Sequence, residues 1–443
     1  MKKILLSLIT ILMPLALLAQ QAGDNFTIKT TDGKTTEWSL AGDSKNGDIS
    51  TIKHKSNQLI LYAKGYEGIE WATYDIDKIE SITFNVFHKG SYVEESAAQA
   101  VKNMGIGTNF GNCTDVVAMW MNMNSNSVTD FEKAWGQEPT TKPMVDFLKK
   151  NGFNSVRIPV TWFQHMKADG TVDEAWMNRI QEIVDYVIDN GMYCILNVHH
   201  DTGADDEKVK HWIKADEANY KENKEKFEYL WTQIATRFKN YDQHLLFEGY
   251  NEMLDADNTW NAPKNASSYK GLNGYAQSFV NAVRATGGNN ETRNLIINTY
   301  AAANGDDVLN NLAIPTDKVD GHIAVEVHTY APWDWFAQKG KWDASCSNEI
   351  KNMFTRLSNK FISKGIPCII GEYGTHGSKS VSKTSSASEI QAAADQAADI
   401  VKQAKAYGVA TFYWMSIFTE KDRTVPQWTL PTVVEAMKKA YNE

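Results

Sequence analysis

The chain has 443 residues, of which 42% are hydrophobic, and its formal net charge at pH 7 is -9. A chain of this length can hold two or three domains, or one large barrel and a small additional module. The negative charge and the lack of a long Lys/Arg run argue against a nucleic-acid-binding surface.

The N-terminus has the pattern of an export signal. Lys2 and Lys3 precede the apolar run ILLSLITILMPLALLAQ, which is too short for a membrane span and has a cleavage position at Ala19. We therefore predict a signal peptide over residues 1–19. The first cysteine is Cys113, so no lipid-anchoring cysteine follows the cleavage position. We expect a bacterial protein that is secreted or periplasmic and has no membrane association after cleavage.

The chain contains four cysteines, Cys113, Cys194, Cys346 and Cys368. An exported chain could pair them into two disulfides. However, Cys194 and Cys368 lie in apolar, strand-like runs, where buried free thiols are at least as reasonable. Their spacing does not indicate a metal site.

Residues 20–90 are predicted to form a small β-rich module. FTIKTTDGKTTEWSL alternates around Asp32-Gly33, which is a hairpin signal, and QLILYAKG and KIESITFNV have the composition of further strands. The segment is too short for a catalytic core. We interpret it as a spacer or packing appendage rather than a sugar-binding module.

Residues 91–443 alternate between short apolar runs and longer amphipathic stretches. The predicted strands are MGIGTNF, SVRIPV, YCILNVHH, LLFEGYNE, LIINTY, HIAVEVHTY, PCIIGEYG and ATFYWMSI. Alternation of strands and helices indicates parallel strands with crossover helices, and eight repeats over about 350 residues are typical of a (β/α)8 barrel. A doubly wound sheet is the alternative, but GIGTNFGN lacks the GxGxxG phosphate-loop spacing.

Polar residues stand where six of these predicted strands end. They are Arg157, His199-His200-Asp201, Asn251-Glu252, His328 with Tyr330, Glu372, and Trp414. In a (β/α)8 barrel the carboxyl ends of the strands meet at the face where the active site is built. Any one of these residues has an ordinary structural explanation, but the joint pattern predicts a site.

Glu252 and Glu372 are predicted to face each other across the barrel mouth. Two carboxylates flanking a glycosidic bond can act as acid/base and nucleophile. Arg157 near one carboxylate would keep it ionised, and Tyr330 could donate a hydrogen bond to it. Asn251 could hold a sugar 2-hydroxyl group. The fourteen tryptophans fit this interpretation, since flat rings stack on sugars, although core packing explains any single Trp equally well.

A metal site at His199-His200-Asp201 is an alternative explanation of that cluster. No further ligand with credible spacing follows it, so we do not predict a metal site there.

From about residue 93 to the end, the chain resembles glycoside hydrolase family 5, the retaining β-glycanases on a (β/α)8 barrel. The matching segments are GIGTNFGNCTD, GFNSVRIPVTW, LNVHHD, FEGYNEM, VEVHTYAP, IIGEYG and FYWMSI, in family order. The resemblance implies Glu252 as acid/base and Glu372 as nucleophile. The other hallmark positions of the family's site are occupied by Arg157, His199, Asn251, His328, Tyr330 and Trp414.

The resemblance also implies residues that bind substrate. Asn109 and Asn112 remain from the family's first-strand segment, where this chain has TNFGNCTD, and we expect them to bind sugar on the distal glycone side. His200 and Trp333 are further substrate-binding candidates. Trp120, Trp162, Trp333 and Trp335 are candidate stacking platforms.

The implied activity is that of a retaining endo-β-1,4-glucanase acting by double displacement on a β-glucan, without a cofactor. A mannanase or xyloglucanase with the same catalytic pair is the alternative. A barrel that binds polysaccharide without cutting it is a remote third hypothesis, because such a protein does not need both Glu252 and Glu372. We expect a monomer.

Overall fold

The computed structural model describes residues 25–39, 49–63, 70–85, 92–332, 341–375, 380–414 and 422–443. The chain divides into two compact units, Met1–Lys89 and Gly90–Glu443. The predicted signal peptide, residues 1–19, lies outside the described residues and stays a prediction.

The N-terminal unit is built from two three-stranded antiparallel sheets, in the orders β2-β1-β6 and β3-β4-β5. Side chains from both sheets meet in one small apolar core that includes Phe26, Trp38 and Leu61. The predicted hairpin is confirmed, since the first two strands pair on either side of Gly33, whose φ is +84°. The strands are β1 (Asn25–Thr30), β2 (Thr35–Ser39), β3 (Ile49–Lys55), β4 (Gln58–Ala63), β5 (Glu70–Asp75) and β6 (Ile79–Asn85).

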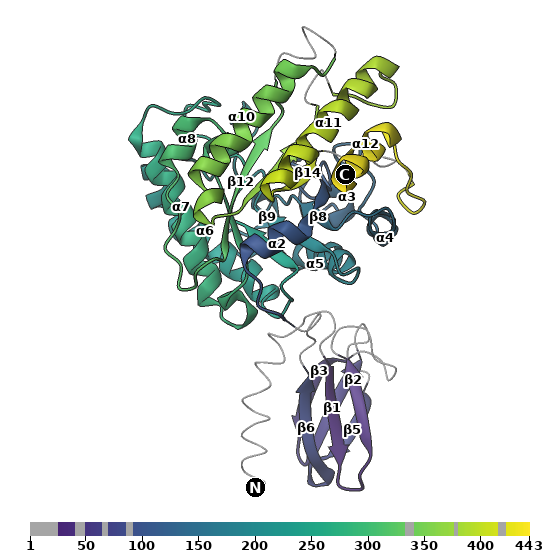
Figure 1. Ribbon diagram of the computed structural model, residues 1–443. Helices are drawn as coiled ribbons and strands as arrows, with labels where there is room; N and C mark the ends of the chain where they lie inside the picture. Colours follow the sequence, from purple (N-terminus) through teal and green to yellow (C-terminus); the bar gives the residue numbers. More distant parts are fainter. Residues whose placement is uncertain are drawn as a thin grey trace. The chain divides into compact units, whose positions relative to one another are not determined.

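The C-terminal unit is a closed barrel of eight parallel strands, which confirms the predicted (β/α)8 architecture (Figure 1). Neighbouring strands follow chain order, and the last strand pairs with the first. The strands are β7 (Ile106–Asn109), β8 (Ser155–Ile158), β9 (Tyr193–Asn197), β10 (Leu245–Glu248), β11 (Leu295–Asn298), β12 (Ile323–Thr329), β13 (Cys368–Tyr373) and β14 (Ala410–Tyr413).

Helices surround this barrel and bury their apolar faces against the outer side of its strands (Figure 1). The α-helices are α2 (Ala97–Met104), α3 (Val128–Lys133), α4 (Lys142–Lys150), α5 (Glu174–Ile188), α6 (Glu217–Arg237), α7 (Ala266–Ala285), α8 (Asp306–Asn311), α10 (Ala344–Lys360), α11 (Ala387–Tyr407) and α12 (Pro431–Asn442). Local signals fix their ends. For example, α11 begins at a capping box formed by Ser386 and Glu389 and ends at left-handed Gly408.

The inside of the barrel has an apolar lower part and a polar upper part. Ile195, Leu246 and Phe412 belong to a buried cluster that also contains residues of α2. That helix therefore closes the lower opening of the barrel. Above this cluster, inward positions near the strand ends carry amides and charged groups, so a polar layer lies over an apolar floor.

The ladder between β12 and β13 shifts register at Val327/His328, and the ladder between β13 and β14 shifts between Ile370 and Tyr373. Bulges of this kind change the direction of the side chains beside them. They lie at the two strands that supply His328 and Glu372, which explains how both residues reach the centre of the barrel mouth.

All four cysteines are buried free thiols, so the disulfide alternative does not hold. Among the described residues, no helix combines the length and the apolar character that a membrane crossing requires.

Candidate active site

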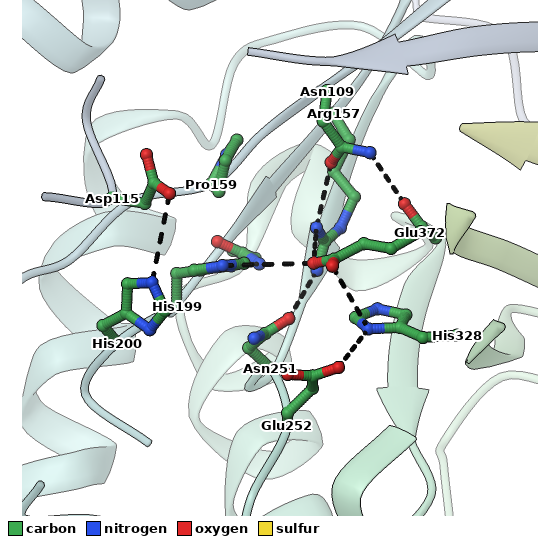
Figure 2. A network of polar contacts seen from close by, with 12 residues as sticks. Asn109, Asp115, Arg157, Pro159, His199, His200, Asn251, Glu252, His328 and Glu372 are labelled. Atoms are coloured by element: carbon green, nitrogen blue, oxygen red, sulfur yellow. Dashed lines mark hydrogen bonds and ion pairs between the residues drawn. The ribbon is translucent and has the colours of Figure 1, made fainter. Parts of the chain in front are cut away.

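Arg157 is the central cation of the site (Figure 2). It comes from β8 and is completely buried. Its Nη1 donates to Glu372 Oε1 at 2.9 Å, and its Nη2 donates to the side-chain oxygen of Asn251 at 2.8 Å. One guanidinium therefore fixes a candidate nucleophile and the amide next to the candidate acid/base. Because Arg157 holds the oxygen of Asn251, the amide nitrogen is the end available to a substrate hydroxyl.

Two further carboxylates lie beneath Arg157 inside the barrel. Glu248 on β10 accepts from Nε at 2.7 Å and from Nη2 at 2.8 Å, in the paired geometry that a carboxylate and a guanidinium favour. Glu326 on β12 lies 3.3 Å from Nε. Both carboxylates are fully buried. They anchor the guanidinium from below, so that its remaining donors point to the mouth.

Glu372, at the end of β13, is held by donors on both of its oxygens. Tyr330 donates to Oε2 at 2.6 Å, and Arg157 donates to Oε1. Burial, together with the charge of Glu252, raises the pKa of Glu372 above its usual range, while the charges of His328 and Arg157 and the Tyr330 hydrogen bond act in the opposite direction. These contacts favour the carboxylate form, which is the form that a nucleophile requires.

Glu252 follows β10 and lies close to Glu372 (Figure 2). Ligand atoms of Glu252, His328 and Glu372 all lie within 4.8 Å of one another, so an oxygen of one carboxylate is within that distance of an oxygen of the other. The Glu252 side chain is 22% exposed, whereas that of Glu372 is 5% exposed. Glu252 is thus the more solvent-accessible member of the pair, as a group that exchanges protons with water should be.

His328 lies between carboxylates on both of its ring nitrogens. Nδ1 is 2.9 Å from Glu252 Oε1 and 3.6 Å from Glu372 Oε2, and Nε2 is 3.2 Å from Glu326 Oε1. Burial opposes a charge on the ring, but Glu372, Glu252 and Glu326 together raise the pKa of His328 to about 10. The surrounding carboxylates therefore favour the imidazolium form of the ring.

His199 and Trp414 form another wall of the site. Their rings stack with centroids 5.6 Å apart and an angle of 9° between planes. Asn197 accepts from the backbone N–H of Val160, and its amide group donates to His199 Nδ1 at 3.0 Å. Nε2 of His199 consequently carries the proton, and it points to Glu372 Oε1 at 4.0 Å. Burial lowers the pKa of His199 well below its usual range, so this ring is a neutral donor.

The predicted His199-His200-Asp201 cluster does not assemble as a metal site. Asp201 instead accepts hydrogen bonds from Trp212 Nε1 and from the backbone of Trp162. The carboxylate that does approach the two histidines is Asp115, which lies 4.0 Å from His200 Nε2. The three groups that lie together are therefore Asp115, His199 and His200, without Asp201.

A cavity of about 230 Å³ opens beside the candidate acid/base. Glu252, Asn251 and His200 contribute to it, together with Trp135 and Trp260. Trp260 is 54% exposed and Trp135 is 37% exposed. Exposed aromatic rings next to a carboxylate are the arrangement that a sugar-binding cleft needs.

Other residues that the sequence predicted as binding groups fall in different positions. Asn109 is completely buried, donates to the Gly371 carbonyl at 2.9 Å and accepts from Arg157 at 3.0 Å. We therefore now expect it to orient Arg157 rather than to bind sugar. Asn112 is partly exposed with φ at 61°, and its binding role stays a prediction. The platform interpretation is wrong for Trp162, which is fully buried and donates to a backbone carbonyl.

Trp120 is 71% exposed and stays a candidate platform. Trp333 and Trp335 lie outside the described residues.

A polar layer beneath the mouth was not predicted from the sequence; it is formed by Asn197, Glu248, Asn298 and Glu326. A signal for two of them was available, because each glutamate interrupts an apolar strand run, FEGY and VEVH. A carboxylate inside a fully buried strand needs a charged partner, and Arg157 was the candidate partner.

Comparison with known proteins agrees with this geometry. Residues 113–418 match the model of the cellulase family, glycosyl hydrolase family 5. The chain is 35% identical over 363 residues to a cellulase/esterase of Acetivibrio thermocellus, covering 77% of this chain and 40% of that relative. It is 33% identical to endoglucanase 1 of Ruminococcus albus, covering 84% of this chain and 88% of the relative.

Among solved structures, a glycoside hydrolase family 5 enzyme from Prevotella bryantii is 57% identical. The structural match covers 80% of this chain and 100% of the Prevotella bryantii chain, with a TM-score of 0.76. A mutant of that enzyme has been solved in complex with a xyloglucan tetradecasaccharide. The family match covers well over half of the chain and coincides with a barrel that carries two adjacent glutamates at its mouth. This chain belongs to glycosyl hydrolase family 5.

Proposed function

We propose that the protein is a retaining endo-β-1,4-glucanase that hydrolyses β-glucans by double displacement. The observation that carries the proposal is the proximity of Glu252 and Glu372, whose nearest ligand oxygens are within 4.8 Å. Retaining glycosidases hold their carboxyl groups about 5–5.5 Å apart, whereas inverting enzymes separate them by about 6.5–9.5 Å to admit a water molecule.

In the first step, Glu372 attacks the anomeric carbon while Glu252 gives a proton to the departing oxygen. Arg157 and Tyr330 hold the attacking carboxylate in place through their hydrogen bonds. As Glu372 forms the new bond, its carboxylate loses negative charge, and the Tyr330 hydroxyl stays within hydrogen-bond distance of Oε2. The amide nitrogen of Asn251 is placed to bind the sugar 2-hydroxyl, a contact that strengthens as the ring gains oxocarbenium character.

In the second step, Glu252 acts as a base. It removes a proton from a water molecule, which attacks the anomeric carbon and releases Glu372, so that the configuration is retained. The greater exposure of Glu252 supports this role, because water must reach it.

Similar solved structures support a second candidate substrate, one with side branches. The enzyme from Prevotella bryantii was crystallised as a mutant with a xyloglucan oligosaccharide, and other similar structures are described as broad-specificity endoglucanases. Xyloglucan is therefore the second candidate substrate for this chain. A mannan substrate differs by an axial 2-hydroxyl, which is the group that Asn251 is placed to bind.

The decisive experiment is a product assay on carboxymethylcellulose, barley β-glucan, xyloglucan, glucomannan, galactomannan and xylan. We expect oligosaccharides from the glucans with the wild-type protein and none with Glu372→Gln. Activity confined to the two mannans would replace the glucanase assignment by a mannanase. Binding without hydrolysis of any polymer would contradict the enzymatic proposal.

The location of the enzyme and its oligomeric state are separate parts of the proposal. We propose that the enzyme is exported after removal of residues 1–19 and that it works as a monomer on polymeric substrate outside the cytoplasm. Mass spectrometry of the mature N-terminus tests the first statement, and light scattering tests the second.

A further inference from the structure

Glu326 is a buried carboxylate that the double-displacement mechanism does not use. It is fully buried within β12, two residues before His328. Its Oε1 lies 3.2 Å from His328 Nε2 and 3.3 Å from Arg157 Nε. Its Oε2 is buried and has no hydrogen-bond partner among the described residues. Burying a carboxylate costs desolvation free energy, and an apolar side chain would fill the same space at lower cost. Glu326 is therefore expected to have a role beyond packing.

The neighbouring strand is adapted to this side chain. Gly371 lies on β13, beside Glu326, and a Cβ atom at Gly371 would stand 1.9 Å from Glu326 Oε1. The three atoms that such a Cβ would meet first all belong to Glu326. Glycine at this position therefore makes the space for the carboxylate. The position of the Glu326 side chain thus depends on the residue type at position 371 on the neighbouring strand.

Glu326 and Glu252 contact opposite nitrogens of the same imidazole ring. Glu326 binds Nε2, and Glu252 binds Nδ1 at 2.9 Å. A carboxylate that accepts from Nε2 requires a proton on that nitrogen. The proton that can be exchanged is then the one on Nδ1, which faces the acid/base.

We propose that Glu326 is a positioning residue for proton transfer: it holds the proton on Nε2 of His328, so that His328 Nδ1 and Glu252 share the single proton delivered to the leaving oxygen. The inference rests on the proposed function. In the first step the His328–Glu252 pair loses that proton to the glycosidic oxygen as the bond to the anomeric carbon breaks and the electron pair goes to oxygen. In the second step the pair regains one proton from the attacking water, so the enzyme returns to its starting protonation state.

The charged and titratable groups around His328 come from five strands. They are Glu248 and Glu252 from β10 and the turn after it, Arg157 from β8, His199 after β9, Glu326 and Tyr330 from β12 and its end, and Glu372 from β13. Arg157 and His199 do not add a negative charge near Nε2. Glu326 is the carboxylate that contacts Nε2, and it contributes to the raised pKa of His328.

The test compares wild type with Glu326→Gln, which keeps the shape of the side chain and a hydrogen-bond acceptor but removes the charge. Removing a negative charge at contact distance lowers the proton affinity of the His328–Glu252 pair. The basic limb of the pH profile of kcat/KM on cellotetraose should move to lower pH by about 1 unit. With a 2,4-dinitrophenyl cellobioside, whose leaving group needs no protonation, the rate of glycosylation should stay within about twofold.

A second arm checks that Glu326 acts through the acid/base. In a Glu252→Gln background, adding Glu326→Gln should cause no further loss on cellotetraose, because the proton path is already broken. Equal losses on both substrates with an unshifted basic limb would overturn the proposal, since a general structural defect gives that result. A Glu326→Gln variant indistinguishable from wild type would overturn it as well.

The unaltered enzyme provides a measurement that does not depend on folding of a variant. Nitrogen-15 NMR of histidine-labelled protein at pH 8 should show His328 with a proton on Nε2, whether or not Nδ1 also carries one. A neutral His328 with its proton on Nδ1 would contradict the assignment. Wild-type hydrolysis of β-glucan is scored separately, so failure of the proposed function and failure of this inference are distinguishable.

Discussion

Arg157 Nη1 donates to Glu372 Oε1 at 2.9 Å, which places a buried cation against the candidate nucleophile. The same guanidinium is anchored from below by the fully buried Glu248. Three carboxylates, Glu248, Glu326 and Glu372, therefore share one cation, and the position of Arg157 determines how Glu372 is held at the centre of the mouth.

The Tyr330→Phe substitution tests the second donor to Glu372. Tyr330 bonds the carboxylate at 2.6 Å, and that bond acts to lower the pKa of Glu372. Its removal should raise this pKa, so the acid limb of the kcat/KM profile should move to higher pH. The rate at the optimum should fall by about 10²-fold or more, as for loss of one preorganised donor. A profile with an unmoved acid limb would contradict the assignment.

The Arg157→Met substitution tests the cost of removing the cation. Three buried carboxylates then lack their counter-charge, and breaking a buried ion pair in this way costs about 3–5 kcal/mol of unfolding free energy. The pKa of Glu248 is already raised to about 7, mainly by burial, and Arg157 acts to lower it.

Loss of Arg157 raises this pKa further above that of the unfolded chain, so the folded variant binds protons more tightly than the unfolded one. Its stability should therefore increase as pH falls from 8 to 5. Urea unfolding at the two pH values measures this. Wild-type-like stability at pH 8 would show that the cation is dispensable.

The Glu252→Gln substitution tests the acid/base role. Hydrolysis of polysaccharide should fall by about 10²–10⁴-fold, the usual contribution of a general acid. Glycosylation by a dinitrophenyl glycoside should be largely preserved, because its leaving group departs unprotonated, and the intermediate should then accumulate. Stopped-flow detection of a burst of dinitrophenolate measures this. An equal loss of the first step on both substrates would argue against the role.

The Gly371→Ala substitution tests the fit between β13 and Glu326. The added Cβ would stand 1.9 Å from Glu326 Oε1, which requires the carboxylate or the strand to move. We expect a loss of about 1–3 kcal/mol of stability, as for overpacking of a core. Since the nearest atoms all belong to Glu326, the double variant Gly371→Ala/Glu326→Ser should recover part of that loss. Thermal unfolding of wild type, of each single variant and of the double variant measures it, and an additive loss in the double variant would contradict the fit.

The sequence predicted the barrel well because its signals were local. Each of the eight strands is a short apolar run, and the long helices carry an amphipathic period, so both elements could be located from pattern alone. The shared direction of parallel strands also placed Arg157, Asn251 and Glu372 at one end. The short helix α2 was not predicted, because eight residues are too few for a helical period to stand out in the sequence.

The depth of a residue within the mouth could not be predicted in the same way. Asn109 and Trp162 stand at strand ends in the sequence, yet both are fully buried. Their burial depends on how neighbouring strands pair and on the bulges beside His328 and Glu372. Glu248 and Glu326 were missed for a related reason, since a buried carboxylate makes sense only when its distant partner, Arg157, is known to lie against it.

The most direct test of the account is the stereochemistry of the first product. Proton NMR during hydrolysis of cellopentaose by the wild-type enzyme follows the anomer that is released before mutarotation. The proximity of Glu252 and Glu372 predicts that the β anomer appears first, which is retention. Initial release of the α anomer would mean direct attack by water and would contradict the role of Glu372 as nucleophile.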